Sequence, residues 1–354
     1  MHNDQSGRRS FVIRSSRRNA LPEVSFRIDA RLVVVCASLL GATVAVLLVA
    51  LSVGDYDIPL TEVIATLVGG GTPQSQLVVG EWRLPRAVLG IALGAALGMS
   101  GAVFQSLTRN PLGSPDIIGF STGAYTGGLV VILLFGGGYL QTAVGAVAGG
   151  LATAALVYAL AYRRGIQGFR LIIVGIGVSA TLASVNSWLV TRANLDDAMQ
   201  AAVWGSGSLS GLGYEQLWPV LGLLVLVCPI LLAHTPALRQ LELGDDAARA
   251  LGVRAEAVRL SSLMWGIVLV AIATAAAGPI AFIALVAPQI ARRLIGTATL
   301  SLLPAAFAGG LLLLSSDLVA QRAFAPTQLP VGVMTVVVGG AYFVWLLIRE
   351  GRKR

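Results

Sequence analysis

Few side chains in this sequence could carry out bond chemistry. The histidines His2 and His234 are far apart, and the cysteines Cys36 and Cys228 both fall inside apolar runs. Cysteines in such runs are typical of small buried hydrophobic residues, and their spacing indicates neither a disulfide nor a metal site. The lone lysine, Lys353, stands near the C-terminus, so no Gly-rich phosphate loop ending in lysine is present. We therefore predict no catalytic residue, no metal, no cofactor and no ATP site in this chain.

Three groups of polar residues remain as candidate binding sites. Arg83, Arg86 and Arg322 stand at the edges of apolar runs, and guanidinium groups suit bidentate pairing with carboxylates. The acidic stretch 241–253 reads LELGDDAARALGV between two apolar runs. The third group lies inside the apolar run 171–191 and comprises Ser179, Ser184, Asn186 and Ser187.

The elements that position these residues are membrane-spanning helices. The chain has 354 residues, of which 56% are hydrophobic and only 12% are charged, with a mean hydropathy of +0.80. A soluble domain carries about 25% charged residues, so the excess apolar surface must face lipid or other buried helices. Barrel strands alternate apolar and polar residues, whereas these runs are unbroken. The fold class is therefore an all-α polytopic membrane protein with about ten spans.

The predicted spans divide the chain into a basic tail 1–31, a membrane domain 32–349 and a basic tail 350–354. A cleavable signal peptide would have a shorter basic start, so we expect an uncleaved first span. The segment 279–291 is too short to cross alone and begins at Gly278–Pro279, which predicts a broken or tilted helix that is buried in protein or lines a cavity. The ten predicted spans are 32–52, 84–107, 116–135, 140–162, 171–191, 216–234, 260–278, 279–291, 302–320 and 330–348.

The basic residues orient these spans. With the N-terminus in the cytoplasm, 21 of the 25 basic residues lie in cytoplasmic segments, as the positive-inside rule predicts. The exceptions on the outer face are Arg83, Arg86, Arg192 and Arg322. Both basic tails are then cytoplasmic, which favours an even number of spans.

The stretch 241–253 lies in the predicted cytoplasmic loop 235–259. Gly244 breaks the chain, Asp245 or Asp246 can cap a helix start, and Gly252 can end the helix. The pattern predicts a helix of about two turns. It is equally typical of an ordinary capped surface helix and of a docking helix that includes Leu251 and receives force from a motor protein.

The segment 83–124 combines close helix packing with a rigid turn. Gly90, Gly94 and Gly98 recur every four residues, so one face of this span admits a close neighbour. Asn110 and Pro111 begin the turn NPLGSP, in which two prolines prevent a helix from continuing. Packing alone is sufficient to explain the glycines.

Several ordered blocks resemble the permease family of bacterial ABC importers for iron–siderophore complexes, haem and cobalamin. They are the segment 83–124, WGSGSL at 204–209, the stretch 244–253, GPIAFIALVAPQIARR at 278–293 and QLPVGV at 328–333. The resemblance covers nearly the whole chain after the basic tail. EWRLPR, FQSLTRNPLGSPDIIGF, GFRLIIVGIGV and QLPVGV are most similar to the second permease subunits of ferric enterobactin importers.

The resemblance implies a ferric-siderophore importer, of catecholate type, in the cytoplasmic membrane. Its partners would be a second permease subunit (a copy or a paralogue), a cytoplasmic ATPase dimer and an extracytoplasmic siderophore-binding protein, with no nucleic acid. Residues 244–253 match the ATPase-docking segment, and span 171–191 matches a span that lines the pathway. Arg83 and Arg86 match two outer arginines that pair with the binding protein. At the third position the sequence has Gln321, followed by Arg322.

Other functions fit the residues less well. Haem or cobalamin import is the alternative within the family. An ion-coupled secondary transporter would need carboxylates within its spans, and only Asp317 lies in a late span, where we expect it to pair with Arg322 or cap the outer turn. A membrane-embedded enzyme would need a catalytic constellation that the sequence lacks. Gln289 stands where the family usually has histidine, a departure that the sequence does not explain.

Overall fold

The structure is a computed structural model that describes residues 2–3, 9–14, 25–116, 118–162, 168–297 and 299–351. In this part of the chain, seven helical segments are long and apolar enough to cross a membrane, and shorter apolar helices accompany them. The prediction of an α-helical multi-span protein is therefore confirmed. The helices at the ten predicted positions are α1 (Ala30–Ser52), α4 (Leu84–Thr108), α5 (Phe120–Phe135), α6 (Tyr139–Ala161), α7 (Gly168–Arg192), α9 (Tyr214–Glu242), α11 (Ala255–Ala277), α12 (Ile283–Ile295), α13 (Leu302–Arg322) and α14 (Val331–Gly351).

Shorter elements connect these helices. They are α2 (Leu60–Leu67), α3 (Pro73–Ser75), the π-helical turn η1 (Gln76–Arg83), α8 (Leu195–Gly205) and α10 (Asp245–Ala250). The N-terminal tail holds a small antiparallel sheet of β1 (His2–Asn3), β2 (Arg9–Arg14) and β3 (Ser25–Asp29), in the order β1-β2-β3. This sheet was not predicted from the sequence. Residues 163–167, between the predicted spans 140–162 and 171–191, and residues 352–354 of the C-terminal tail lie outside the described residues.

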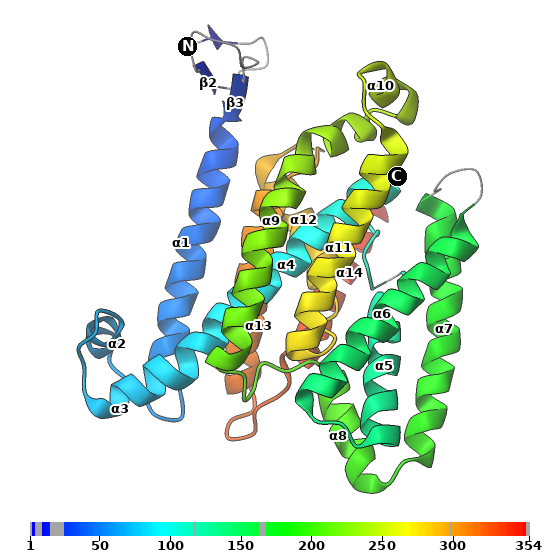
Figure 1. The fold of residues 1–354 in the computed structure, drawn as a ribbon. Helices are drawn as coiled ribbons and strands as arrows, with labels where there is room; N and C mark the ends of the chain where they lie inside the picture. The colour runs from blue at the N-terminus through cyan, green and yellow to red at the C-terminus, as the bar shows by residue number, and fades with distance from the viewer. Residues whose placement is uncertain are drawn as a thin grey trace.

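The two ends of the helix bundle carry different elements. Figure 1 shows the N-terminal strands, α10 and the C-terminus of the chain at one end, and α2, α3 and α8 at the other. This arrangement agrees with the predicted even number of crossings. The α10 end therefore carries the segments that the arginine distribution assigns to the cytoplasm, and the other end is called the outer end below.

Helix α4 crosses the centre of the bundle and is its most buried span. Its glycines face α13, as their spacing predicts. A Cβ atom built on Gly94 would lie 2.3 Å from the Gly309 carbonyl oxygen, and one on Gly98 would lie 2.2 Å from that of Ala305. Because no Cβ tolerates such distances, only glycine allows the two backbones to approach this closely.

The chain breaks between α11 and α12, as the short predicted span requires. Gly278 and Phe282 both have positive φ angles, of 74° and 69°, so helical geometry is interrupted over residues 278–282. The break is held by another loop, because the Ser208 N–H donates to the Ala277 carbonyl at 2.8 Å. Helix α12 then has 13 residues and returns to the α10 end.

The turn after α4 has the rigidity that its sequence predicts. The Leu112 N–H donates to Asn110 Oδ1 at 2.9 Å, an Asx turn, and the Gly113 N–H donates to the Asn110 carbonyl at 2.9 Å. The Gln289 amide of α12 donates to the Pro111 carbonyl at 2.9 Å. Gln289 therefore fastens this turn to α12, which gives the family departure at this position a structural role.

Candidate functional site

Helix α10 is a short, separately bounded element beyond the cytoplasmic end of α9. Gly244 precedes it with a φ angle of 118°, and Gly252 follows it with a φ angle of 85°. Both angles are readily adopted only by glycine. Ala248, on the inner side of α10, is fully buried, so α10 packs against the bundle. The predicted helix with a glycine at each end is confirmed.

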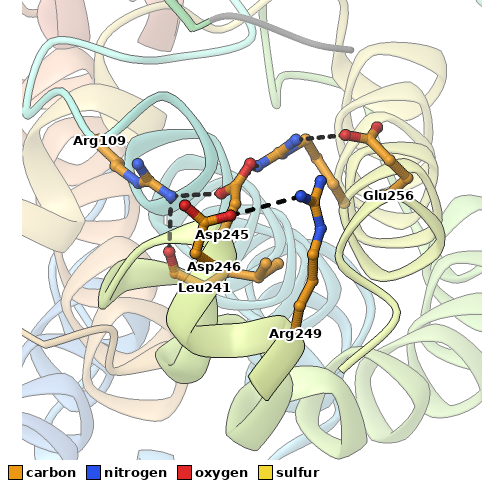
Figure 2. Close-up of polar contacts among 7 residues, drawn as sticks. Arg109, Leu241, Asp245, Asp246, Arg249 and Glu256 are labelled. Atoms are coloured by element: carbon orange, nitrogen blue, oxygen red, sulfur yellow. Dashed lines mark hydrogen bonds and ion pairs between the residues drawn. The ribbon is translucent and has the colours of Figure 1, made fainter. Parts of the chain in front are cut away.

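Asp245 anchors α10 to two spans (Figure 2). Its Oδ1 accepts from Arg109 Nη2 at 2.6 Å and from Arg259 Nη2 at 2.9 Å. Arg109 directly follows α4 and also donates to the Leu241 carbonyl at 2.9 Å, and Arg259 of α11 also donates to Glu256 at 2.9 Å. No side chain caps the start of α10, whose N-cap is Gly244. The predicted capping by Asp245 or Asp246 is therefore wrong. The Asp245 carboxylate instead accepts hydrogen bonds from the guanidinium groups of Arg109 and Arg259.

The charge of Asp245 is held by this network. Partial burial raises the pKa of its carboxyl, but the hydrogen bonds and positive charges of Arg259 and Arg109 outweigh that effect and lower the pKa below its ordinary value. The network therefore stabilises the fold above the ordinary aspartate pKa of about 4. That contribution is lost as the pH falls through the lower pKa of the folded state.

The remaining predicted docking residues are available on the surface of α10. The Asp246 side chain is fully exposed and meets Arg249 only at 3.6 Å. Leu251 is 60% exposed, and Leu243, which the sequence analysis did not single out, is 71% exposed. Helix α10 thus presents the Asp246 carboxylate to solvent, and the leucines that flank it, Leu243 and Leu251, are exposed on either side. Asp245 and Ala248 hold the helix against the bundle.

At the outer end, Arg83 points into its own chain. Its Nη1 donates to the carbonyls of Leu51 and Ser52 at 2.8 and 3.2 Å, and its Nη2 donates to that of Tyr56 at 2.6 Å. Arg83 thereby closes the last turn of α1, whose carbonyls lack intrahelical partners.

Arg86 is engaged across the bundle. Its guanidinium forms a bidentate pair with the Asp317 carboxylate of α13 at 2.9 and 2.8 Å. Gln321 also donates to Asp317 at 2.8 Å. The expectation that Asp317 pairs with Arg322 or caps the outer turn is therefore wrong, because the Asp317 carboxylate pairs with Arg86. Gln321, which the resemblance places at the third outer-arginine position, belongs to the same network.

Arg322 is the least engaged of the three predicted docking arginines. Its Nη1 lies 3.4 Å from Asp55 Oδ1, and the Asp55 side chain is 75% exposed. An ion pair this exposed contributes little energy. Of the three, Arg322 is the one that could exchange its partner at small cost.

The four predicted pathway residues on α7 do not share one face. Asn186 is buried, and its Oδ1 has no hydrogen-bond partner among the described residues. Ser179 Oγ likewise has no hydrogen-bond partner in this part of the chain. Ser184 and Ser187 are exposed and donate to the carbonyls of Ala180 and Ala183 within their own helix. These two bonds satisfy the hydroxyl donors without a neighbouring helix.

A cavity of about 640 Å³ lies between α5, α7 and the break before α12. Asn186 and Ser187 line it, whereas Ser179 and Ser184 do not. Ser121, Thr122 and Tyr125 of α5 also line it, and the sequence analysis missed them. Their hydroxyl groups at positions 2, 3 and 6 of FSTGAYTG were the available signal, because that spacing places them on neighbouring parts of one helix surface.

Among the described residues, no group of three or more histidine, cysteine or carboxylate side chains could hold a metal ion. The polar residues of the α5–α7 cavity are hydroxyls and an amide. The cavity can therefore offer hydrogen bonds to a solute. The ion pairs described above lie at the two ends of the bundle.

Comparison with known proteins extends these observations. The FecCD transport family model matches residues 42–349. The ferric enterobactin transport system permease protein FepG of Escherichia coli is 48% identical, over 92% of this chain and 99% of that protein. The iron(3+)-hydroxamate import system permease protein FhuG of Bacillus subtilis is 36% identical, over 86% and 94%. A solved metal-chelate type ABC transporter in an inward-facing conformation superposes with a TM-score of 0.79, at 28% identity, over 89% of this chain and 99% of that one.

These matches span the bundle from α1 to α14. They agree with the apolar helices in placing the chain in the cytoplasmic membrane as a multi-pass protein. The expected family resemblance is confirmed, and the chain belongs to the FecCD transport family.

Proposed function

We propose that this chain is the membrane-spanning subunit of an ABC importer that carries a ferric siderophore of the catecholate type. The observation that carries the proposal is the 48% identity to a ferric enterobactin permease over almost the full length of both chains. Similarity to a hydroxamate permease is lower, at 36%, which favours the catecholate class.

The proposed complex has partners at both ends. A second permease subunit, a paralogue or a copy of this chain, would complete the pathway, and an ATPase dimer would bind at α10. An extracytoplasmic binding protein would deliver the ferric siderophore to the outer end. The exposed leucines and Asp246 of α10 would contact the ATPase. Asp245, Arg109 and Arg259 would pass its movement to α4 and α11, because they tie α10 to both spans.

The coupling role of Asp245 gives one prediction. Asp245→Asn keeps the side-chain shape but removes the charge that holds Arg109 and Arg259. We expect ATP-driven uptake in proteoliposomes to fall about tenfold, since each charge-assisted hydrogen bond contributes about 1.5–3 kcal/mol. ATP hydrolysis should continue, so that the ratio of transport to hydrolysis falls.

Asp196→Asn is the matched control for this experiment. Like Asp245, Asp196 is an acidic residue in the first turn of a short helix, but it is exposed and lies on α8 at the outer end. Its removal should leave the ratio unchanged. Equal ratios in wild type and Asp245→Asn would refute the coupling role. A loss confined to pH values below about 4 in wild type would agree with the lowered pKa of Asp245.

The outer arginines give a second prediction. Arg83 and Arg86 serve the fold, so reversing their charges would disturb the bundle together with any docking. Arg322→Gln removes the most weakly paired charge, and we expect binding-protein affinity to fall up to about fivefold. Arg192→Gln, an exposed arginine at the same end, is the control. Identical affinities measured for wild type and Arg322→Gln would remove Arg322 from the docking surface.

The proposed substrate is tested by uptake. A strain lacking this gene would be offered radioactive iron bound to catecholate siderophores, hydroxamate siderophores, haem, or labelled cobalamin. Loss of catecholate uptake alone, restored by the gene, is the expected result. Loss of haem or cobalamin uptake with normal siderophore uptake would favour the alternative function within the family.

A further inference from the structure

A groove of about 650 Å³ lies between α6, α9 and α11 in the outer half of the bundle. Helices α6 and α9 each pack against α11 but share at most marginal contact with each other. Helix α11 therefore forms the floor of the groove, with Ile272, Ala275 and Ala276, and residues of the segments 139–151 and 215–223 form its walls. We call it the α6–α9 groove.

The α6–α9 groove has the depth of the outer membrane leaflet. From Tyr139 to Leu151, α6 runs about 18 Å, a little more than half of the hydrocarbon core of about 30 Å. Tyr139 and Trp218 are 44% and 64% exposed near the outer end of the groove, and such aromatic side chains prefer the boundary with the lipid headgroups. The Tyr139 hydroxyl donates to the Ala276 carbonyl at 2.8 Å, which fixes the start of α6 on α11. An acyl chain in the groove would therefore run beside the acyl chains of that leaflet.

The groove lies away from the side on which a second permease subunit is proposed. Helix α6 packs against α5 and α7, so it separates the groove from the α5–α7 cavity, and the two cavities have no lining residue in common. In Figure 1, α9 and α11 lie in front of α14. A subunit that completes the pathway beside α7 would therefore leave the α6–α9 groove facing lipid.

The polar residues of the groove all lie at its outer mouth. Apart from Tyr139, Glu215 and Gln216, every lining residue is apolar. Glu215 is exposed and forms no ion pair with a basic side chain in the described part of the chain. Gln216 Oε1 accepts from the Gly213 N–H at 2.9 Å, and its amide nitrogen donates to none of the described residues. The mouth thus offers an acceptor with negative charge beside a neutral donor.

We propose that the α6–α9 groove binds an acyl chain of phosphatidylethanolamine from the outer leaflet, with the ammonium group on Glu215 and the phosphate on the Gln216 amide. The ammonium donates charge-assisted hydrogen bonds to the carboxylate. The methylated nitrogen of phosphatidylcholine cannot donate them, and phosphatidylglycerol has no cation to offer. Because α6 and α9 hardly contact each other, the bound chain fills the space between them and stabilises their spacing.

The test uses the full-length chain, in the complex in which it purifies, in nanodiscs. Phosphatidylethanolamine with a photoreactive group in one acyl chain is added in trace amounts, and mass spectrometry identifies the labelled peptides. We expect labelling to concentrate in the segments 139–151 and 215–223. Unlabelled phosphatidylethanolamine should compete with it better than phosphatidylcholine or phosphatidylglycerol does.

Two substitutions separate the acyl chain from the headgroup. Ala148→Phe fills the groove, since Ala148 is exposed and lines it, and labelling should fall several-fold. Ala155→Phe is its control, because Ala155 is exposed two turns further along α6 and does not line the groove. Glu215→Gln should weaken the preference for phosphatidylethanolamine up to about fivefold. Asp196→Asn, which removes another exposed carboxylate at the outer end, should leave that preference unchanged.

Three outcomes would overturn the proposal. Labelling spread evenly over all exposed apolar helix surfaces would show ordinary surrounding lipid rather than a site. Equal competition by the three lipids would exclude the headgroup contacts. Loss of binding-protein affinity in Glu215→Gln, with unchanged lipid labelling and preference, would assign Glu215 to a protein interface instead.

Discussion

Arg86→Met is expected to lower the free energy of unfolding by about 3 kcal/mol. The substitution removes the bidentate partner of Asp317, whose side chain is only 3% exposed. Gln321 remains as a donor, but an amide does not neutralise a buried carboxylate. Chemical or thermal unfolding in a neutral detergent measures the loss.

The double variant Arg86→Met/Asp317→Leu should recover most of that loss. Replacing both partners of a buried ion pair by apolar residues of similar volume is often neutral, so the two substitutions should be strongly non-additive. Arg192→Met removes an exposed arginine at the same end and serves as the control. If the single and double variants were equally unstable, Arg86 would act through contacts other than Asp317.

The second large effect is expected at the contact between α4 and α13. Gly309→Ala adds only a Cβ atom, but that atom would lie 2.1 Å from the Gly94 carbonyl oxygen. The backbones must then separate, which costs about 2 kcal/mol by the usual scale of overpacking. The expected result is a lower yield of folded protein and a lower midpoint of thermal unfolding.

Gly222→Ala is the control for the packing argument. Gly222 lies within α9, and a Cβ atom built there meets no atom within 4 Å. The substitution should leave stability unchanged or raise it by up to about 1 kcal/mol, because alanine favours helix more than glycine does. If both alanine variants behaved alike, the close approach of α4 and α13 would contribute nothing measurable.

The positions of the spans could be predicted from the sequence because burial in lipid leaves a local signal. Apolar runs of about 20 residues indicate a crossing wherever they occur, and basic residues distinguish the two faces. The broken helix was also predictable, since Gly278 and Pro279 interrupt a run too short to cross. The start of α5 was placed four residues early, because Asp116, Ile118 and Gly119 belong to the turn after α4.

The partners of the charged residues could not be predicted in the same way. Arg86 and Asp317 are distant in sequence, and neither hydropathy nor spacing relates them. Asp245 matches the pattern of a capping residue, but the nearby guanidinium groups of Arg109 and Arg259 bind it more strongly than backbone amides would. The α5 residues that line the cavity were missed for a related reason. Hydroxyl groups in an apolar helix can be assigned to a cavity only when the helix that faces them is known, here α7.

Ion pairs hold both ends of α4 in place. Arg86 joins its first turn to α13, and Arg109, immediately after its last turn, joins it to α10. About 35 Å of helix separates these two contacts, and the backbone contact at Gly94 and Gly98 lies between them. A rod that is held at both ends and closely supported in between moves only together with the helices that hold it. In the proposed importer, a push on α10 would therefore be passed along α4 to α13 at the outer end of the bundle.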